Sequence, residues 1–234
     1  SRPIVLLRKR PDGAIGAGVA DRLSELGVMV PYTPVQHLLM HDFAEAWEAA
    51  HPEEAAAACA PGTPVPLLVM TSGNVHDEPI CIADEEAREK LASIADAFLG
   101  NNRPILTRFD DSVVRLIQVD EVDEKPGYAI QFLRRARGYA PVPVSVAAEG
   151  AAPAEGVIFA AGPEQKNTFT LLRGTDGFVS QHIGDVENAE TYDAWLATKD
   201  RFESLFEMEP AAVACDLHPE YLTSKWAHHQ GLPV

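Results

Sequence analysis

Residues 145–155, SVAAEGAAPAE, constrain the fold of this chain most, because they contain little that a hydrophobic core would bury. Small residues dominate the segment, and a glycine and a proline interrupt any regular element, which is typical of a linker. The segment predicts two folding units in the 234-residue chain, the first over residues 1–144 and the second over residues 156–234. A chain of this length is sufficient for two modest domains.

The composition narrows the functional classes. The formal net charge is −16, so a main partner of nucleic acid is disfavoured except where arginines cluster. The three cysteines (Cys59, Cys81 and Cys215) form no C-x-x-C pair, which indicates neither a zinc site nor a disulfide framework. No apolar run is long enough for a signal or membrane segment. These observations predict a cytoplasmic protein that binds neither nucleic acid nor membrane.

The first unit alternates strand and helix patterns. Short apolar runs predict strands over residues 4–7, 27–30, 67–70, 113–119 and 128–133. Residues 84–99 predict a helix that Asp84 caps and Gly100 ends. Residues 41–64 are rich in alanine and glutamate and are broken by Pro52, so we expect a helix-loop insertion on the surface. The pattern favours an α/β unit with a mixed sheet.

The second unit begins with three predicted strands over residues 157–160, 169–172 and 178–183. A helix over residues 189–206, a strand over 212–215 and a helix over 222–230 follow. The expected order is therefore β-β-β-α-β-α.

A cluster of small polar residues directly follows the predicted strand at residues 67–70. Thr71, Ser72 and Asn74 flank a glycine there, and hydroxyl and amide groups at a strand's carboxyl edge are suited to ligand binding. Ser-Gly and Gly-Asn are also common turn pairs, so an ordinary β-turn is the alternative.

Two aspartates precede the predicted strand at residues 113–119. Asp110 and Asp111 are followed by Ser112, with Arg115 three residues further on. Paired aspartates can hold Mg²⁺ or position a nucleotide, and they can equally form an Asx turn.

Three arginines end the first unit. Arg134, Arg135 and Arg137 are conspicuous in so acidic a chain, and the planar guanidinium group suits phosphate and carboxylate recognition. A solvated charge run is the alternative. Because neighbouring residues on a strand face opposite sides, only part of the cluster can share one site.

The second unit carries candidate groups in two loops. Lys166 lies on a hairpin loop after Gly162, but the segment lacks the second glycine and the following helix of a Walker A motif. His182 and Asp185, in SQHIGD, are spaced like ligands or proton-transfer groups at a strand end. No metal-binding spacing of histidines is present, so we predict no metal ligand.

Taken in order, these motifs resemble one family. In the first unit, GVMVPYTPVQHLLM (27–40), VMTSGN (69–74), DDSVVR (110–115) and LRRARGYAP (133–141) resemble a YrdC-like domain. In the second unit, GPEQKNTF (162–169), SQHIGD (180–185) and CDLHPEY (215–221) resemble the start of an actin-like (ASKHA-type) domain related to threonylcarbamoyl-transferases. This architecture resembles the HypF-type carbamoyltransferases of hydrogenase maturation.

The resemblance implies an activity and its partners. Carbamate derived from carbamoyl phosphate would be adenylated with ATP and Mg²⁺ in the YrdC-like domain, and the actin-like domain would transfer the carbamoyl group to the C-terminal cysteine of a HypE-type partner. Thr71, Ser72, Asn74, Ser112, Arg115, Arg134 and Arg137 would bind nucleotide, and Lys166, His182 and Asp185 would be catalytic in the second site. The resemblance further implies a longer protein, of which this chain holds part of each domain. It implies zinc or iron only in that complete protein.

Two other functions remain open at this stage. A YrdC-type threonylcarbamoyl-adenylate synthase of tRNA modification fits the first unit, although the acidity and the appended second unit argue against it. A non-catalytic nucleotide-binding or docking module is the other alternative.

Overall fold

The structure, a computed structural model, describes residues 1–10, 15–16, 18–57, 67–76, 78–122, 125–147, 149–150 and 152–234. Contacts between residues divide the chain into two units. Unit 1 comprises Ser1–Thr71 and Ser112–Arg134, and unit 2 comprises Ser72–Asp111 and Arg135–Val234. Cys59 and the end of the predicted insertion, residues 58–64, lie outside the described residues. None of the described helices is both long and apolar enough to span a bilayer.

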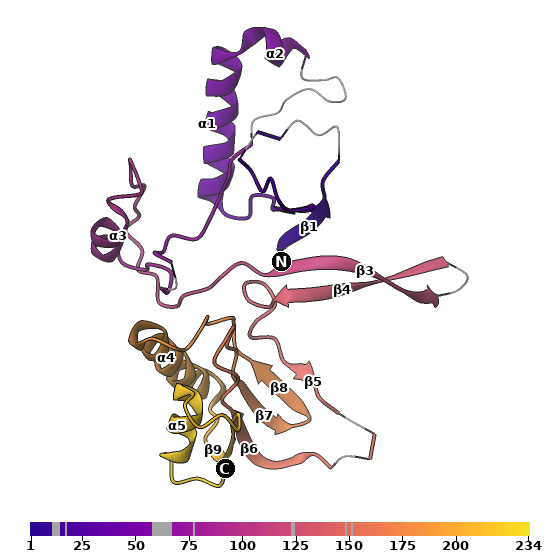
Figure 1. The fold of residues 1–234 in the computed structure, drawn as a ribbon, viewed down its shortest axis with the longest axis vertical. Helices are drawn as coiled ribbons and strands as arrows, with labels where there is room; N and C mark the ends of the chain where they lie inside the picture. Colours follow the sequence, from indigo (N-terminus) through magenta and orange to yellow (C-terminus); the bar gives the residue numbers. More distant parts are fainter. Residues whose placement is uncertain are drawn as a thin grey trace. The chain divides into compact units, whose positions relative to one another are not determined.

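Unit 1 contains a mixed four-stranded sheet in the order β2-β1-β3-β4. Strand β1 (Ile4–Arg8) pairs antiparallel with β2 (Glu25–Val28) and parallel with β3 (Val113–Val122), and β3 forms a long hairpin with β4 (Lys125–Arg134) (Figure 1). Helix α1 (Pro34–Ala50) begins with a capping box between Thr33 and Gln36, and α2 (Pro52–Ala57) follows it. The helical run is broken directly before Pro52, at His51, as the proline predicted, and α1 buries no residue, which agrees with a surface element.

Two predictions for unit 1 were wrong. Residues 67–70 form no strand, because none of the described strands pairs with them; the side chains of Leu67 and Val69 are 68% and 80% exposed. The predicted strand 27–30 begins and ends two residues earlier, at Glu25 and Val28, where the ladder with β1 sets its bounds. An apolar run alone does not make a strand, since the backbone groups require a partner.

The helix predicted over residues 84–99 is also shorter than expected. Helix α3 is Asp84–Leu91, and its N-cap is Ala83, so Asp84 does not cap it and Gly100 does not end it. The residues that would have continued its apolar face are exposed, with Ile94 at 69% and Phe98 at 43%. Most of a helix's stability in a protein comes from packing of that face, which explains the early end.

Unit 2 contains a five-stranded sheet in the order β5-β8-β7-β6-β9. The strands are β5 (Val144–Ser145), β6 (Ala154–Ala160), β7 (Thr170–Gly174), β8 (Asp176–Val179) and β9 (Pro210–Ala214). Helix α4 (Ala189–Phe206) precedes β9 and α5 (Leu222–His228) follows it, which confirms the predicted β-β-β-α-β-α order from β6 onward. The strand expected to reach residue 183 ends at Val179, so SQHIGD lies beyond the ladder.

The hydrophobic core lies in unit 2, where α4 and α5 pack on the sheet (Figure 1). Trp195 of α4 is fully buried and contacts Phe159 of β6 edge to face, with ring centroids 5.7 Å apart. Trp226 of α5 contacts the same Phe159 ring at 5.1 Å. Such edge-to-face pairs add to the burial of the rings and hold the sheet that carries the loops described below.

Asn188 is the N-cap of α4, and its Oδ1 atom accepts a hydrogen bond from the backbone N–H of Thr191 at 2.8 Å. We expect Asn188→Ala to lower the free energy of unfolding by about 1 kcal/mol, because a backbone donor of the first turn loses its partner. Asn188→Asp keeps the acceptor and should retain most of the stability. Urea unfolding followed by tryptophan fluorescence would measure both, and equal losses in the two variants would contradict the capping role.

Candidate functional site

The loop between β6 and β7 is held in place by one buried asparagine. The side chain of Asn167 is fully buried, and its Nδ2 atom donates to the carbonyl oxygens of Ala161 (3.1 Å) and Pro163. Gly162 stands between them with φ +75°, in the left-handed region that favours glycine. The loop that carries Lys166 is therefore closed on itself by side-chain and backbone contacts.

Two of the predicted catalytic residues meet at this loop. The Oδ1 atom of Asp185 accepts a hydrogen bond from the backbone N–H of Lys166 at 2.7 Å. Asn167 donates its backbone N–H to Gly184 and accepts one from Ile183, at 2.8 and 2.9 Å. The SQHIGD segment thus lies against the Lys166 loop, although the lysine side chain itself is exposed.

The third predicted residue, His182, pairs with an aspartate far away in the sequence. Its Nδ1 atom lies 2.6 Å from Oδ2 of Asp110, and the two side chains are only 19% and 16% exposed. Sequence reasoning treated Asp110 as a candidate Mg²⁺ ligand or turn residue and missed this pair. The paired aspartates were the signal, but only the tertiary structure brings residue 110 to residue 182.

Asp111, next to Asp110 in the sequence, forms an ion pair with Arg137 of the predicted arginine cluster. Arg137 Nε lies 2.6 Å from Asp111 Oδ1, and the backbone N–H of Arg137 donates to the carbonyl of Asp110 at 3.1 Å. Arg135 instead donates to the backbone carbonyls of Tyr139 and Val142, at 2.9 and 2.6 Å, and burial lowers its pKa. Arg135 and Arg137 therefore differ in their contacts, and both lie beyond the end of β4 at Arg134, where the alternation of side chains along a strand does not apply.

The remaining predicted nucleotide-binding residues are divided between the two units. Thr71, Ser112, Arg115 and Arg134 belong to unit 1, whereas Ser72 and Asn74 belong to unit 2 with Arg137. Ser112 is fully buried and its carbonyl accepts the N–H of Ile4 at 2.8 Å.

Ser72 and Asn74 form a closed turn. Ser72 Oγ donates to Asn74 Oδ1, and Asn74 Nδ2 donates to the carbonyls of Val75 and Glu78 at 3.0 Å each. These hydrogen bonds support the alternative interpretation of the motif as an ordinary turn. Arg115, in unit 1, contacts Gln131 at 2.7 Å and Glu25 at 3.8 Å across the sheet.

Glu86 of α3 anchors the segment that leads to the two aspartates. It lies 3.6 Å from Arg108 and 3.4 Å from Lys90, and Arg108 in turn accepts a hydrogen bond from Gln181 at its carbonyl oxygen, at 3.3 Å. Burial alone would raise the pKa of Glu86. The hydrogen bond from the Ile82 N–H and the two cations outweigh burial, so the pKa lies below its usual 4.5.

The lowered pKa of Glu86 predicts a pH-dependent contribution to stability. The stabilisation is present above the unfolded-state pKa of 4.5 and is lost as the pH falls through the lower folded-state value. We expect Glu86→Gln to lower the free energy of unfolding at pH 7 by up to about 1 kcal/mol. The difference from the unsubstituted protein should shrink below pH 4.5. Urea unfolding at a series of pH values would test this, and a difference that does not change with pH would contradict it.

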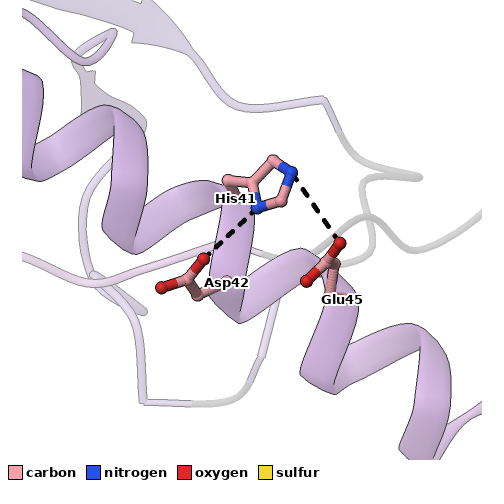
Figure 2. A group of neighbouring side chains, drawn as sticks. All are labelled: His41, Asp42 and Glu45. Atoms are coloured by element: carbon pink, nitrogen blue, oxygen red, sulfur yellow. Dashed lines mark hydrogen bonds and ion pairs between the residues drawn. The ribbon is translucent and has the colours of Figure 1, made fainter.

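One group of potential metal ligands lies on α1. Figure 2 shows His41 between Asp42 and Glu45, with Nδ1 3.2 Å from the first carboxylate and Nε2 3.8 Å from the second. One ligand atom from each of the three side chains lies within 4.8 Å of the others. All three residues are exposed, so the arrangement is that of surface ion pairs.

A small apolar pocket of about 100 Å³ also lies in unit 1, lined by Met29, Pro31, Gln36, Leu39, Met40, Leu67, Leu68 and Met70. It contains none of the predicted site residues. Polar groups that could orient a ligand are scarce in it, since Gln36 also belongs to the capping box of α1.

Comparison with known proteins decides the family. The family model described as telomere recombination, of the Sua5/YciO/YrdC type, matches residues 1–134, and the model of the HypF Kae1-like domain matches residues 153–234. The chain belongs to the HypF family. The predicted mixed α/β fold and its YrdC-like domain are confirmed.

Relatives within the HypF family cover this chain almost completely. Carbamoyltransferase HypF2 of Cupriavidus necator is 44% identical over 97% of the chain and 26% of its own length. Carbamoyltransferase HypF of Synechocystis sp. is 34% identical over 99% of the chain and 26% of its own length. A crystal structure of full-length HypF in a phosphate- and nucleotide-bound form is 39% identical, with a TM-score of 0.79 over 99% of this chain and 31% of that chain. The chain thus spans about a quarter of the curated HypF relatives.

The boundaries of the two structural units differ from those of the two family matches. Residues 72–111 fall inside the match to the telomere recombination model, yet they pack in unit 2 with the residues that match the Kae1-like model. The His182–Asp110 pair therefore joins segments that belong to two different family models.

Proposed function

We propose that this chain is part of a carbamoyltransferase of [NiFe]-hydrogenase maturation. Carbamate derived from carbamoyl phosphate would be adenylated with ATP, and the carbamoyl group would then pass to the C-terminal cysteine of a HypE-type partner. The observation that carries the proposal is the succession of a YrdC-type match and a HypF Kae1-like match along one chain. The names of the curated relatives and the phosphate- and nucleotide-bound state of the related crystal structure support it. We place the protein in the cytoplasm.

We assign the adenylation step to the YrdC-like domain, with domain limits of 1–144, a linker over 145–155, and an actin-like domain over 156–234. Thr71, Ser72, Asn74 and Ser112 would contact the nucleotide or carbamate through hydroxyl and amide groups, and Arg115, Arg134 and Arg137 would meet the phosphates. Such a reaction depends mainly on positioning and on positive groups around the triphosphate.

Magnesium would enter with the nucleotide phosphates. Asp110 and Asp111 are held by His182 and Arg137, so their carboxylates do not form an open oxygen-ligand pair for Mg²⁺. We therefore assign no magnesium ligand to this chain. A zinc or iron ion is expected only in the complete protein.

We assign the transfer step to Lys166, His182 and Asp185. Asp185 would hold the loop through the Lys166 backbone, the exposed lysine side chain would neutralise charge on the carbamoyl adenylate, and His182 would accept the proton of the acceptor thiol.

The full-length protein tests the adenylation step. With ATP and carbamoyl phosphate we expect release of pyrophosphate, and we expect Arg134→Ala to reduce the rate by roughly 100-fold, because a cation at the transferring phosphate is lost. Arg173→Ala, on β7, is the matched control and should leave the rate unchanged. Pyrophosphate release that depends on threonine and bicarbonate instead would favour the tRNA-modification alternative. Nucleotide binding without release of pyrophosphate would favour a docking module.

A further inference from the structure

The pair of His182 and Asp110 has the geometry of a base with an orienting carboxylate. An ionised carboxylate only accepts hydrogen bonds, so the Nδ1 atom of His182, 2.6 Å from Asp110 Oδ2, carries the proton. The lone pair of the neutral ring is then at Nε2. Within the described part of the chain, Nε2 of His182 makes no hydrogen bond or ion pair. Nδ1 is thus bound to Asp110, and Nε2 is available to accept a proton.

The backbones of His182 and Asp110 are both hydrogen-bonded to one short segment, residues 135–137. The backbone N–H of His182 donates to the carbonyl of Arg135 at 3.2 Å, and the backbone N–H of Arg137 donates to the carbonyl of Asp110 at 3.1 Å. Asp111 fixes the same segment through the Arg137 side chain, at 2.6 Å. Backbone hydrogen bonds on either side therefore set the distance between ring and carboxylate without any contribution from a bound ligand. A catalytic base requires this kind of preorganisation.

We propose that Asp110 is the positioning residue for His182 in the transfer step, an inference that rests on the function proposed above. The acceptor thiol would lose its proton to Nε2 of His182 as its sulfur attacks the carbamoyl carbon. The new carbon–sulfur bond would form as the bond between that carbon and the adenylate oxygen breaks, and AMP would leave with the electron pair. Asp110 would stabilise the imidazolium that results without taking its proton.

Asp110→Asn in the full-length protein is the decisive variant, because it preserves shape while reversing the hydrogen bond. The asparagine amide donates to Nδ1, so the ring proton moves to Nε2 and the base is lost. We expect kcat for transfer of the carbamoyl group to the acceptor thiol to fall by at least about 100-fold, with KM for the acceptor changed less than about threefold. His182→Gln should lose a similar factor, and the double variant should lose no more than either single one. The rate of pyrophosphate release should stay within about twofold of that of the unsubstituted protein, since adenylation does not use this base.

The control is Asp200→Asn, which removes the same charge from an exposed position on α4. Its transfer rate should equal that of the unsubstituted protein. If Asp110→Asn instead reduced both half-reactions equally and lowered the melting temperature, Asp110 would be a structural link, and the inference would be wrong while the proposed function stood. If the unsubstituted protein formed no carbamoyl adenylate, the proposed function itself would fail, and the inference with it.

Discussion

Gly162→Ala is expected to lower the free energy of unfolding by at least about 3 kcal/mol. A Cβ atom built on Gly162 would lie 2.2 Å from the carbonyl oxygen of Thr168 and 2.9 Å from Nδ2 of Asn167. The first distance is to the backbone, so the loop itself would have to move. The left-handed φ of +75° adds the strain of an L-residue in that conformation. Urea unfolding followed by the fluorescence of Trp195 and Trp226 would measure the loss.

Gly174→Ala separates the two causes. Gly174 has a similar left-handed φ of +62°, but nothing lies within 4 Å of a Cβ atom built on it. We expect this variant to lose only about 1 kcal/mol, the strain of the backbone conformation alone. Equal losses at both glycines would show that the contact of the added Cβ atom with Thr168 contributes nothing to the loss at Gly162, which would contradict the prediction.

Phe159→Ala is expected to lower the free energy of unfolding by about 4 kcal/mol, because it removes the ring at the centre of the core and leaves a cavity. Phe159 is fully buried on β6, and its ring contacts those of Phe169, Trp195 and Trp226 at centroid distances of 5.3, 5.7 and 5.1 Å. The same fluorescence-detected unfolding would report the change, since two of the three tryptophans of the chain, Trp195 and Trp226, contact this ring.

Leu205→Ala is the matched control for the loss of an apolar side chain. Leu205 lies on α4 and is 61% exposed, so its truncation should change the stability by less than about 0.5 kcal/mol. A loss at Phe159 no larger than that at Leu205 would contradict the placement of the core between the sheet and its two helices.

Elements with a strong local pattern were predicted closely. Residues 189–206 combine an N-cap residue, Asn188, with a repeating apolar face, and the helix begins and ends where that pattern does. Strands β3 and β4 were likewise expected from two apolar runs, though both extend further than predicted, and their pairing as a hairpin is a finding of the structure. Residues 67–70 and 92–99 are similarly apolar but form neither strand nor helix. None of the described strands pairs with residues 67–70, and the apolar side chains of Ile94 and Phe98 are exposed. A local pattern therefore predicts a helix or strand correctly only where the tertiary structure packs another element against its apolar face.

The sequence by itself determined the family, the mixed α/β class, the order of elements in the second domain and the polar loops around Lys166 and Asp185. The family follows from the resemblance of the motifs, whereas the other three features depend on residues that are close along the chain, where periodicity, caps and glycine turns act directly. Only the tertiary structure decided that Asp110 meets His182, that Asp111 takes Arg137, and that residues 72–111 pack with unit 2. Such pairs join distant segments, and their distances follow from how the sheet, helices and loops pack together, which no local pattern encodes.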